Sequence, residues 1–306
     1  MEVEAKATPK VTTLIVSHNN APALRKCLAA LQKSNNRDQL EILVVDNGSW
    51  DESPRLDTEF PGVTFLRMPR NFGRTKALNI GIRTAAGELL FFLSPHVLVH
   101  ADTVGKLVDH LVAADDATVA VCPSLRGAAG ELVNKCYPFP TASALFSAWV
   151  SDAPLAAEPP PVTGDAAPVA WTNLDAMLVR KYFVKGINYF DERYGEYLAD
   201  AELSFQVRRA GKKILLLGQL SADVEEPEPV TLGEGPRALL SADFLSGVTT
   251  FAGKHGGFLS SMFYRLRAIL LALGSMLAFR DLGYRGRRFL AVAGMRKVDG
   301  SQTEAI

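Results

Sequence analysis

The chain has 306 residues and a mass of 33.1 kDa, which is enough for one large domain with an appendage or for two small domains. With 48% hydrophobic and 22% charged residues, its composition is that of a globular protein and excludes a largely disordered one. Thirty-three basic residues balance thirty-three acidic ones, so no net charge favours nucleic acid as a partner.

The three cysteines, Cys27, Cys122 and Cys136, are far apart in the sequence and form no C-x-x-C pair. This spacing argues against a zinc site and against a disulfide framework. The first residues, MEVEAK, are charged and contain no apolar run that resembles a signal sequence. We therefore expect a cytoplasmic protein with reduced thiols.

Strand-like and helix-like segments alternate through the first 125 residues. Apolar runs predict strands at Val11–Ser17, Leu40–Val45, Val63–Met68, Leu89–Leu93 and Val119–Val121. Helices are predicted between these strands. One follows an N-cap at Asn20 with Pro22 in its first turn, and two others span Lys76–Ala86 and Thr103–Ala114. This alternation predicts an α/β fold with a mostly parallel sheet covered by helices on both faces. In such sheets ligands bind beyond the carboxyl ends of the strands.

The second half of the chain is less regular. Residues 152–170 include five prolines and six alanines, which predicts an irregular loop or lid. Regular structure is expected to resume with a strand at Trp171–Val179, a helix at Leu198–Ala210 and a short strand at Lys213–Leu217. The acidic segment Asp223–Glu234 contains no lysine or arginine and predicts a solvated linker.

The last fifty residues are basic. From Lys254 to Val298 there are nine lysines and arginines and a single acid, Asp281. A hydrophobic helix is expected at Phe258–Phe279, but its uncharged part is far shorter than the roughly 20 residues that span a bilayer. Its arginines and apolar side chains suit a helix lying on an anionic membrane surface. A helical hairpin packed on the main domain, or on a second subunit of a homodimer, fits the same pattern. We divide the chain into residues 1–226 and a helical tail, 227–306.

Three groups of polar residues could carry chemistry. Asp46 ends a predicted buried strand, and the turn at Gly48 would let a nucleotide approach the backbone, although Asp-Asn-Gly-Ser is also a common turn and helix cap. Arg74 and Asn79 share a helix rich in small residues, a pattern that also serves tight packing. Asp200 opens another helix, where it is either a cap or a general base.

Taken together, the order and spacing of these segments resemble the family 2 glycosyltransferases of GT-A fold, and within them the bacterial rhamnosyltransferase-like enzymes. The resemblance covers about residues 10–226. Its motifs are Val16-Ser17-His18-Asn19-Asn20, Val44-Val45-Asp46-Asn47-Gly48-Ser49-x-Asp51, Asn71-x-Gly73-x5-Asn79-x-Gly81 and Phe190-Asp191-Glu192-x5-Leu198-x-Asp200-x-Glu202-Leu203.

The resemblance implies inverting transfer of a sugar, with rhamnose as one candidate, from a nucleotide-diphosphate donor to a hydroxyl of a cell-envelope glycan or lipid-linked saccharide. Asp200 matches the family's catalytic base. The implied nucleotide or donor contacts are Ser17, Asn19, Asp46, Gly48, Arg74 and Asn79. We assign the acceptor or sugar pocket to Trp171, Asp175 and Glu202. A divalent cation, Mn²⁺ or Mg²⁺, normally neutralises the departing diphosphate.

The metal motif departs from the family. Where relatives carry an Asp-containing motif, this chain has Ser94-Pro95-His96, and Glu225 stands near the usual position of a histidine ligand. His96 and Glu225 would form an exchanged ligand pair closer to manganese or zinc chemistry than to magnesium. Catalysis without a metal, with arginine or lysine neutralising the diphosphate, is a second alternative. A third is a catalytically inactive protein that binds a nucleotide or a partner enzyme.

The same region carries a further departure. Leu174 replaces a glycine of the family's pattern, and we expect it to crowd the space for sugar or acceptor.

Overall fold

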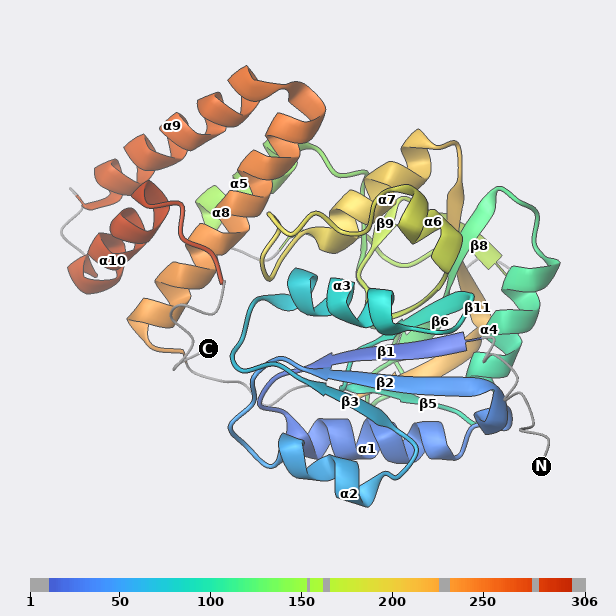
Figure 1. The fold of residues 1–306 in the computed structure, drawn as a ribbon. Helices are drawn as coiled ribbons and strands as arrows, with labels where there is room; N and C mark the ends of the chain where they lie inside the picture. The colour runs from blue at the N-terminus through green and yellow to red at the C-terminus, as the bar shows by residue number, and fades with distance from the viewer. Residues whose placement is uncertain (1–10, 153–154, 162–165, 226–231, 277–280, 299–306) are drawn as a thin grey trace.

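A computed structural model describes residues 11–152, 155–161, 166–225, 232–276 and 281–298 (Figure 1). Most strands belong to one nine-stranded sheet, and a two-stranded sheet lies beside it. The strands are β1 (Val11–Ser17), β2 (Leu40–Asp46), β3 (Thr64–Arg67), β4 (Leu89–Leu93), β5 (Val97–Val99), β6 (Thr118–Arg126), β7 (Cys136–Tyr137), β8 (Ala166–Val169), β9 (Trp171–Thr172), β10 (Ala176–Arg180) and β11 (Lys213–Val224).

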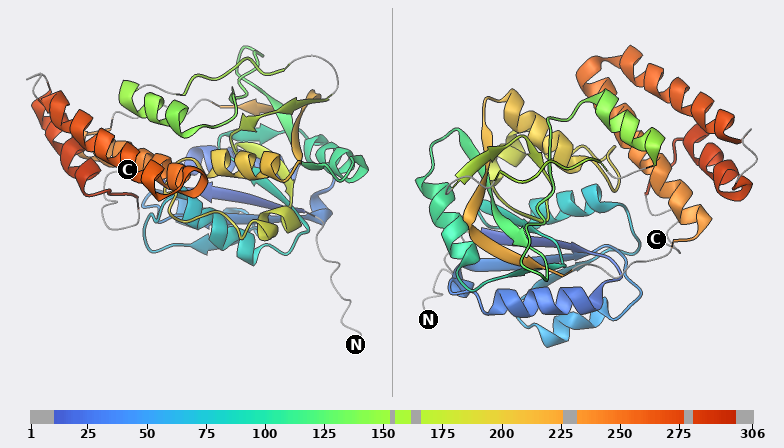
Figure 2. Two further views of the ribbon diagram at one scale, coloured as in Figure 1. Left: turned by 90° about the horizontal axis from the view of Figure 1, so that it is seen from above. Right: turned by 180° about the vertical axis from the view of Figure 1, so that it is seen from behind.

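The helices cover both faces of the large sheet and form a separate group at the C-terminus (Figures 1 and 2). They are α1 (Ala21–Gln32), α2 (Leu56–Glu59), α3 (Arg74–Thr84), α4 (Thr103–Ala113), α5 (Ala142–Ser151), α6 (Lys181–Gly186), α7 (Ala199–Arg209), α8 (Glu234–Gly256), α9 (Phe258–Met276) and α10 (Leu282–Ala293), with short 3₁₀ turns at Arg37–Gln39 and Ser53–Arg55.

The central strands run parallel, as the sequence predicts. The order in the sheet is β3-β2-β1-β4-β10-β6-β11-β5, and β8 pairs with β11. β1 pairs in parallel with β2 and β4, and β6 pairs in parallel with β11, whereas β10 is antiparallel to both of its neighbours. The predicted α/β class with a mostly parallel sheet is therefore confirmed, and the carboxyl ends of β1, β2 and β4 meet at one edge.

Two predicted strands differ from the observed ones. The strand expected at Trp171–Val179 is divided into β9, which pairs with β7, and β10, which pairs with β4 and β6. The strand expected to end at Leu217 continues to Val224 through an irregularity between Leu217 and Ser221. Its last three residues, Ala222–Val224, pair with β5 at the sheet edge, so Asp223 belongs to a strand instead of a linker.

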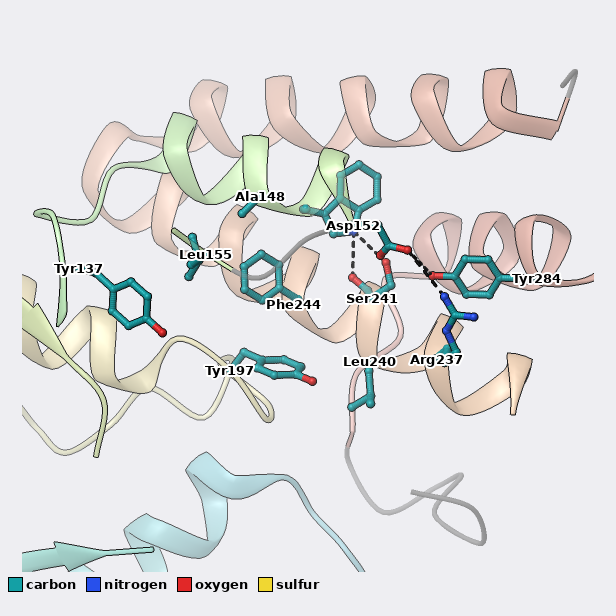
Figure 3. Close-up of a pocket in the computed structure, with 11 residues that line it drawn as sticks. Tyr137, Ala148, Asp152, Leu155, Tyr197, Arg237, Leu240, Ser241, Phe244 and Tyr284 are labelled. Atoms are coloured by element: carbon teal, nitrogen blue, oxygen red, sulfur yellow. Dashed lines mark hydrogen bonds and ion pairs between the residues drawn. The ribbon is translucent and has the colours of Figure 1, made fainter. Parts of the chain in front are cut away.

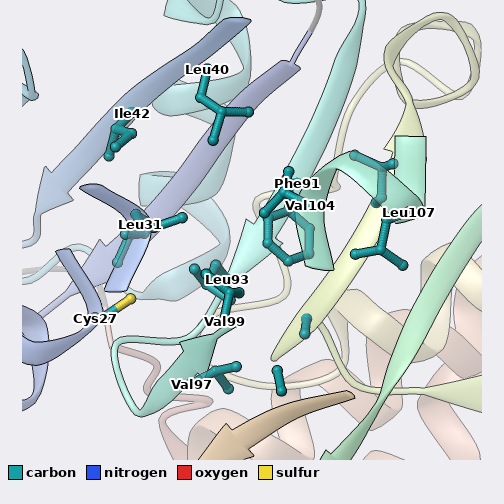
Figure 4. Packing of buried hydrophobic residues seen from close by; sticks show 14 of the residues in the cluster. Cys27, Leu31, Leu40, Ile42, Phe91, Leu93, Val97, Val99, Val104 and Leu107 are labelled. Atoms are coloured by element: carbon teal, nitrogen blue, oxygen red, sulfur yellow. The ribbon is translucent and has the colours of Figure 1, made fainter. Parts of the chain in front are cut away.

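Hydrophobic side chains fill both faces of the sheet. Figure 4 shows one face, where Cys27 and Leu31 of α1 pack toward Leu93 and Val99 of the strands. All three cysteines are free and buried, as expected for reduced thiols. Leu174, which the sequence places near the sugar, is itself buried in the cluster on the opposite face.

The C-terminal helices pack on the rest of the chain through a third hydrophobic cluster. Leu245, Val248 and Phe251 of α8 are buried with Phe146 and Trp149 of α5. Helices α9 and α10 pack on α8 and on each other (Figures 1 and 2). The proposed boundary after residue 226, with the centre of the expected linker, lies outside the described residues. Among the described helices, none is both long and apolar enough to cross a membrane.

Candidate functional site

The loops after β1 and β2 hold each other in place through their polar side chains. Asn19 adopts a positive φ of 51°, its backbone N–H donates to Ser49 Oγ at 3.0 Å, and its side-chain oxygen accepts from Trp50 N–H at 3.0 Å. The Asp46 carboxylate is buried and accepts from Ser49 N–H at 2.9 Å, which is the turn-capping arrangement. The hydroxyl of Ser17 donates to Asn20, one residue beyond the turn.

Glycine is required at position 48. Gly48 has a φ of 78°, and a β-carbon there would lie 2.4 Å from the backbone of Arg70. The backbone of the loop after β2 therefore contacts the backbone of the loop after β3. Beside this contact, Asn47 donates to Asn71 Oδ1 at 2.8 Å, and the same oxygen accepts from Gly73 N–H at 2.8 Å. This series of hydrogen bonds leads from the end of β2 to the first turn of α3.

The first turn of α3 is bound to the loop that precedes α7. Arg74 N–H donates to Glu196 Oε2 at 3.1 Å, and Thr75 N–H donates to the Gly195 carbonyl at 3.0 Å. The backbone donors of this helix end are thus already used within the protein. The Arg74 side chain, about one third exposed, lies 3.7 Å from Asp175 and is the charged group that this turn presents.

Asp200 lies in the electrostatic field of Arg74 and Asp175. It is half-buried in the first turn of α7, and its Oδ1 accepts from Ala201 N–H at 2.9 Å. Burial raises the pKa of Asp200 and the charge of Asp175 adds to this, while Ala201 N–H, the Arg74 guanidinium and the Trp171 indole act to lower it. Because Leu198 is the helix N-cap, Asp200 is not the capping residue. Because its pKa is raised, the Asp200 carboxyl binds a proton more readily than an exposed carboxyl does.

Tyr137 completes this end of the site. Its ring stacks on Trp171 with 4.4 Å between ring centroids, which the antiparallel pairing of β7 and β9 makes possible. Burial, together with the charges of Asp200 and Asp175, raises the pKa of Tyr137 to about 12. The phenol is thus protonated at neutral pH and faces two carboxylates.

Two residues assigned to ligand binding from the sequence, Asn79 and Glu202, instead make hydrogen bonds within the protein. Both amide atoms of Asn79 bind the backbone of Phe190, donating to its carbonyl at 2.8 Å and accepting from its N–H at 3.0 Å. Glu202 is buried, where burial tends to raise its pKa, but Gln206, Lys254 and His255 donate to it and keep the pKa below its usual range. Asn79 positions the segment before α7, and Glu202 fastens α7 to α8.

The residues of the altered metal motif lie close together on neighbouring strands. Glu225 N–H donates to the His96 carbonyl at 2.9 Å, next to the pairing of β5 with β11. Burial lowers the pKa of His96, against the charges of Asp175 and Glu225, which raise it. Both carboxylate oxygens of Glu225, however, accept from Lys26 Nζ at 2.9 Å.

This arrangement does not fit a divalent cation. A bound cation at Glu225 would have to displace the Lys26 ammonium group, and an imidazole with one carboxylate is a small ligand set for Mn²⁺. Within the described ranges, no three His, Cys, Asp or Glu side chains are placed to hold a metal. We therefore derive no catalytic step through a metal.

The structure also brings in residues that the sequence motifs do not contain. Tyr137 and Lys26 come from segments without a recognisable site pattern, and Tyr197 stands at an unspecified position of the motif that begins at Phe190. Only the fold places these three side chains beside the motif residues. A cavity of about 480 Å³ extends from Tyr137 between α5 and α8 (Figure 3). The one signal in the sequence is the number of aromatic residues in these segments, which is equally typical of a core.

The sequence matches the model of the family described as glycosyl transferase family 2 over residues 12–139. It is 26% identical over 304 residues to the N-acetylglucosaminyl-diphospho-decaprenol L-rhamnosyltransferase of Mycobacterium tuberculosis, covering 92% of this chain and 96% of that protein. An N-acetylglucosaminyltransferase of Sinorhizobium fredii is 31% identical over 107 residues, which are 33% of this chain and only 26% of that relative.

Solved structures of glycosyltransferases share the fold. The mannosyltransferase PcManGT of Pyrobaculum calidifontis, in complex with GDP-Man and Mn²⁺, has a TM-score of 0.52 and 18% identity, covering 94% of this chain and 86% of that one. Residues 1–349 of S. aureus TarS in complex with UDP-GlcNAc give a TM-score of 0.53 and 15% identity, covering 91% of this chain and 90% of that one.

Proposed function

This chain belongs to the family 2 glycosyltransferases of GT-A fold, and on that premise we propose that it moves a sugar from a nucleotide diphosphate to a lipid-linked saccharide with inversion at the anomeric carbon. Rhamnose is the candidate sugar, and an N-acetylglucosaminyl diphospholipid is the candidate acceptor. Both follow from the mycobacterial relative, which is similar along nearly its whole length.

The environment of Asp200 supports this proposal most directly. In the proposed reaction Asp200 takes the proton of the acceptor hydroxyl, and the oxygen forms a bond to the anomeric carbon. The bond from that carbon to the diphosphate breaks on the opposite face, and the diphosphate leaves with the electron pair. A carboxylate whose pKa is raised by burial is a stronger base than an exposed one once it is ionised.

Arg74 is the group that we assign to the departing diphosphate. It lies on the Asp200 side of α3, its guanidinium is about one third exposed, and its present partner, Asp175, is 3.7 Å away. A guanidinium can hold two phosphate oxygens at once. The interlocked loops around Asp46 and Asn19 are assigned to the nucleoside, and Gly48 lets the loop after β2 pack closely on the backbone of Arg70.

We further propose that α9 lies on an anionic membrane, where a lipid-linked acceptor is found. Phe258, Leu259, Met262, Phe263, Leu266, Leu270 and Leu273 are all exposed, with Phe258 at 76%. At about 100° per residue they form one stripe along the helix. Arg265 and Arg267 are exposed at its two borders, as in helices that bind anionic interfaces.

Vesicle sedimentation tests the membrane assignment. We expect Leu266→Asp/Leu270→Asp to lose binding to phosphatidylglycerol vesicles, while Val112→Asp, which also replaces an exposed apolar residue but lies on α4, retains it. Equal binding by all three proteins would contradict this role of α9.

The function itself is tested by transfer. The protein is incubated with dTDP-rhamnose or UDP-GlcNAc and a short-chain N-acetylglucosaminyl diphospholipid, and products are identified by mass spectrometry. A glycosylated lipid supports the proposal. If calorimetry shows that neither UDP nor dTDP binds, the catalytic interpretation fails, and a protein that binds only a partner enzyme is left.

A further inference from the structure

A cavity of about 480 Å³ lies beside the base, between α5, α8 and α10 (Figure 3). Its size is within the range of sites that bind small ligands. Tyr137 forms one end, and Asp152, Arg237 and Tyr284 form the other (Figure 3). The cavity is lined by residues of the C-terminal helices and of the catalytic domain together.

Tyr137 links the near end of the cavity to the candidate catalytic residues. Tyr137 both lines the cavity and lies in the field of Asp200 and Asp175, and it stacks on Trp171. A ligand bound at the Tyr137 end would therefore lie near the carboxylate that we assign as the base.

The middle of the cavity presents aromatic surfaces. Tyr197 packs edge-on against Phe244, with 5.7 Å between ring centroids, and both line the cavity. Trp149 is held by hydrogen bonds from its indole N–H to Ser241, at 3.0 Å to the carbonyl and 3.1 Å to the hydroxyl. Rigid aromatic faces of this kind suit the apolar side of a sugar ring or a hydrocarbon chain.

The far end carries a cation with a weak partner. Arg237 lies 3.9 Å from Asp152 and 4.5 Å over the ring of Tyr284, and its side chain is about half exposed. An ion pair of this length between half-exposed groups contributes little. Exchanging the Asp152 contact for a phosphate would therefore cost the Arg237 guanidinium little free energy. A guanidinium can bind a phosphate through two N–H groups.

Building on the proposed function, we infer that this cavity is the acceptor subsite. It holds a saccharide whose sugar ring lies against Tyr137 and the aromatic walls, with the hydroxyl toward Asp200. Arg237 holds the diphosphate that links this sugar to its lipid. The acceptor class is thus a saccharide diphospholipid in place of a neutral glycan.

A cavity-filling pair of variants tests the inference. Ala148 lines the cavity, whereas its neighbour on α5, Ser147, is also small but is exposed and does not line it. Binding of N-acetylglucosaminyl diphospho-farnesol is followed by the fluorescence of the native tryptophans. We expect Ala148→Phe to raise its Kd at least about ten-fold and Ser147→Phe to leave it within about two-fold of wild type.

A second pair tests the diphosphate contact and decides the matter if Ala148→Phe does not fold. Arg237→Gln is compared with Arg287→Gln, an arginine on α10 that pairs with Glu234 at 3.4 Å and does not line this cavity. We expect about ten-fold weaker binding of the farnesol probe in Arg237→Gln alone. Methyl N-acetylglucosaminide, which has no phosphate, should bind both proteins equally.

Binding of UDP and dTDP is measured in all four variants and is expected to match wild type. If the probe binds Ala148→Phe or Arg237→Gln as tightly as wild type, the acceptor lies elsewhere and the inference is overturned, while the proposed transferase function stands. If the probe binds in the cavity but no nucleotide sugar is consumed, the cavity assignment stands and the proposed function fails.

Discussion

The two ends of the site are built in different ways. At the end of β1 and β2, the polar groups of Asn19, Asp46 and Asn47 are bonded to neighbouring loops. At the other end, Asp200, Arg74 and Asp175 face one another without a close ion pair, since Arg74 and Asp175 are 3.7 Å apart. The first region is a rigid frame, and the second keeps charged groups ready for a ligand. Chemistry is therefore expected at the second region and recognition at the first.

The largest effect is expected from Asp200→Asn. The change removes the proton acceptor but keeps the size of the side chain, so transfer should fall about 1000-fold while nucleotide affinity stays within a few-fold. Asp191→Asn, which removes a carboxylate already bound by Arg193, is the matched control and should stay near wild type. Unchanged turnover in Asp200→Asn would refute the base assignment.

Arg74→Gln comes next. Loss of the guanidinium should lower transfer about 100-fold, because the leaving diphosphate loses its nearest assigned cation. Arg83→Gln, on the same helix but paired with Glu192 at 3.4 Å, should lose less than about three-fold. Steady-state rates with saturating acceptor separate the two variants, and equal losses would place the diphosphate elsewhere.

A small effect is expected from metal. Because Lys26 holds both oxygens of Glu225, Mn²⁺ should change the affinity for UDP or dTDP by less than about two-fold in calorimetry. In Glu225→Gln, Mn²⁺ should likewise change the affinity for UDP or dTDP by less than about two-fold. An increase of about ten-fold with Mn²⁺ that Glu225→Gln or His96→Gln removes would instead support the exchanged ligand pair.

The last prediction concerns stability instead of transfer, through the support of the loop before α7. Asp243 is buried in α8 and accepts from Glu196 N–H and Val298 N–H, each at 2.8 Å. Burial raises the pKa of Asp243 to about 6, so the folded state binds this proton more tightly than the unfolded state. Its contribution to the free energy of unfolding is complete below about pH 4 and falls by up to about 3 kcal/mol as the pH rises through 6.

Chemical denaturation of wild type and Asp243→Asn between pH 4 and 7 measures this. The difference in free energy of unfolding between the two proteins should change over that range. A difference that is independent of pH would contradict the assignment of the proton to Asp243.

Much of the fold follows from local patterns. Apolar runs such as Leu89–Leu93 identify the central strands, and the position of Asp46 after such a run identifies the ligand edge. The length of β11 was not predictable, because its extension beyond Leu217 passes through an irregularity and depends on pairing with β5. The packing of α8 on α5 was likewise not predicted, because no helix was expected over Glu234–Gly256 and its partner Trp149 is distant in the sequence.

The sequence motifs account for only part of the candidate site, and the roles given to its residues remain predictions. Asp200 stands out through its spacing from Phe190, whereas Tyr137 meets it through the pairing of two-residue strands that no sequence pattern marks. Asn79 and Glu202 belong to two of the motifs, yet Asn79 bonds to the backbone of Phe190 and Glu202 pairs with Lys254 of α8. A motif thus selects residues near the site without separating those that touch the ligand from those that support it.

The central claim is tested most directly by the product of one reaction. The protein is given a nucleotide-diphosphate sugar and N-acetylglucosaminyl diphospho-farnesol, and the new linkage is examined by NMR. The account predicts a glycosylated lipid whose anomeric configuration is opposite to that of the donor, formed by the wild type and not by Asp200→Asn. A product of retained configuration, or one formed equally by Asp200→Asn, would contradict it.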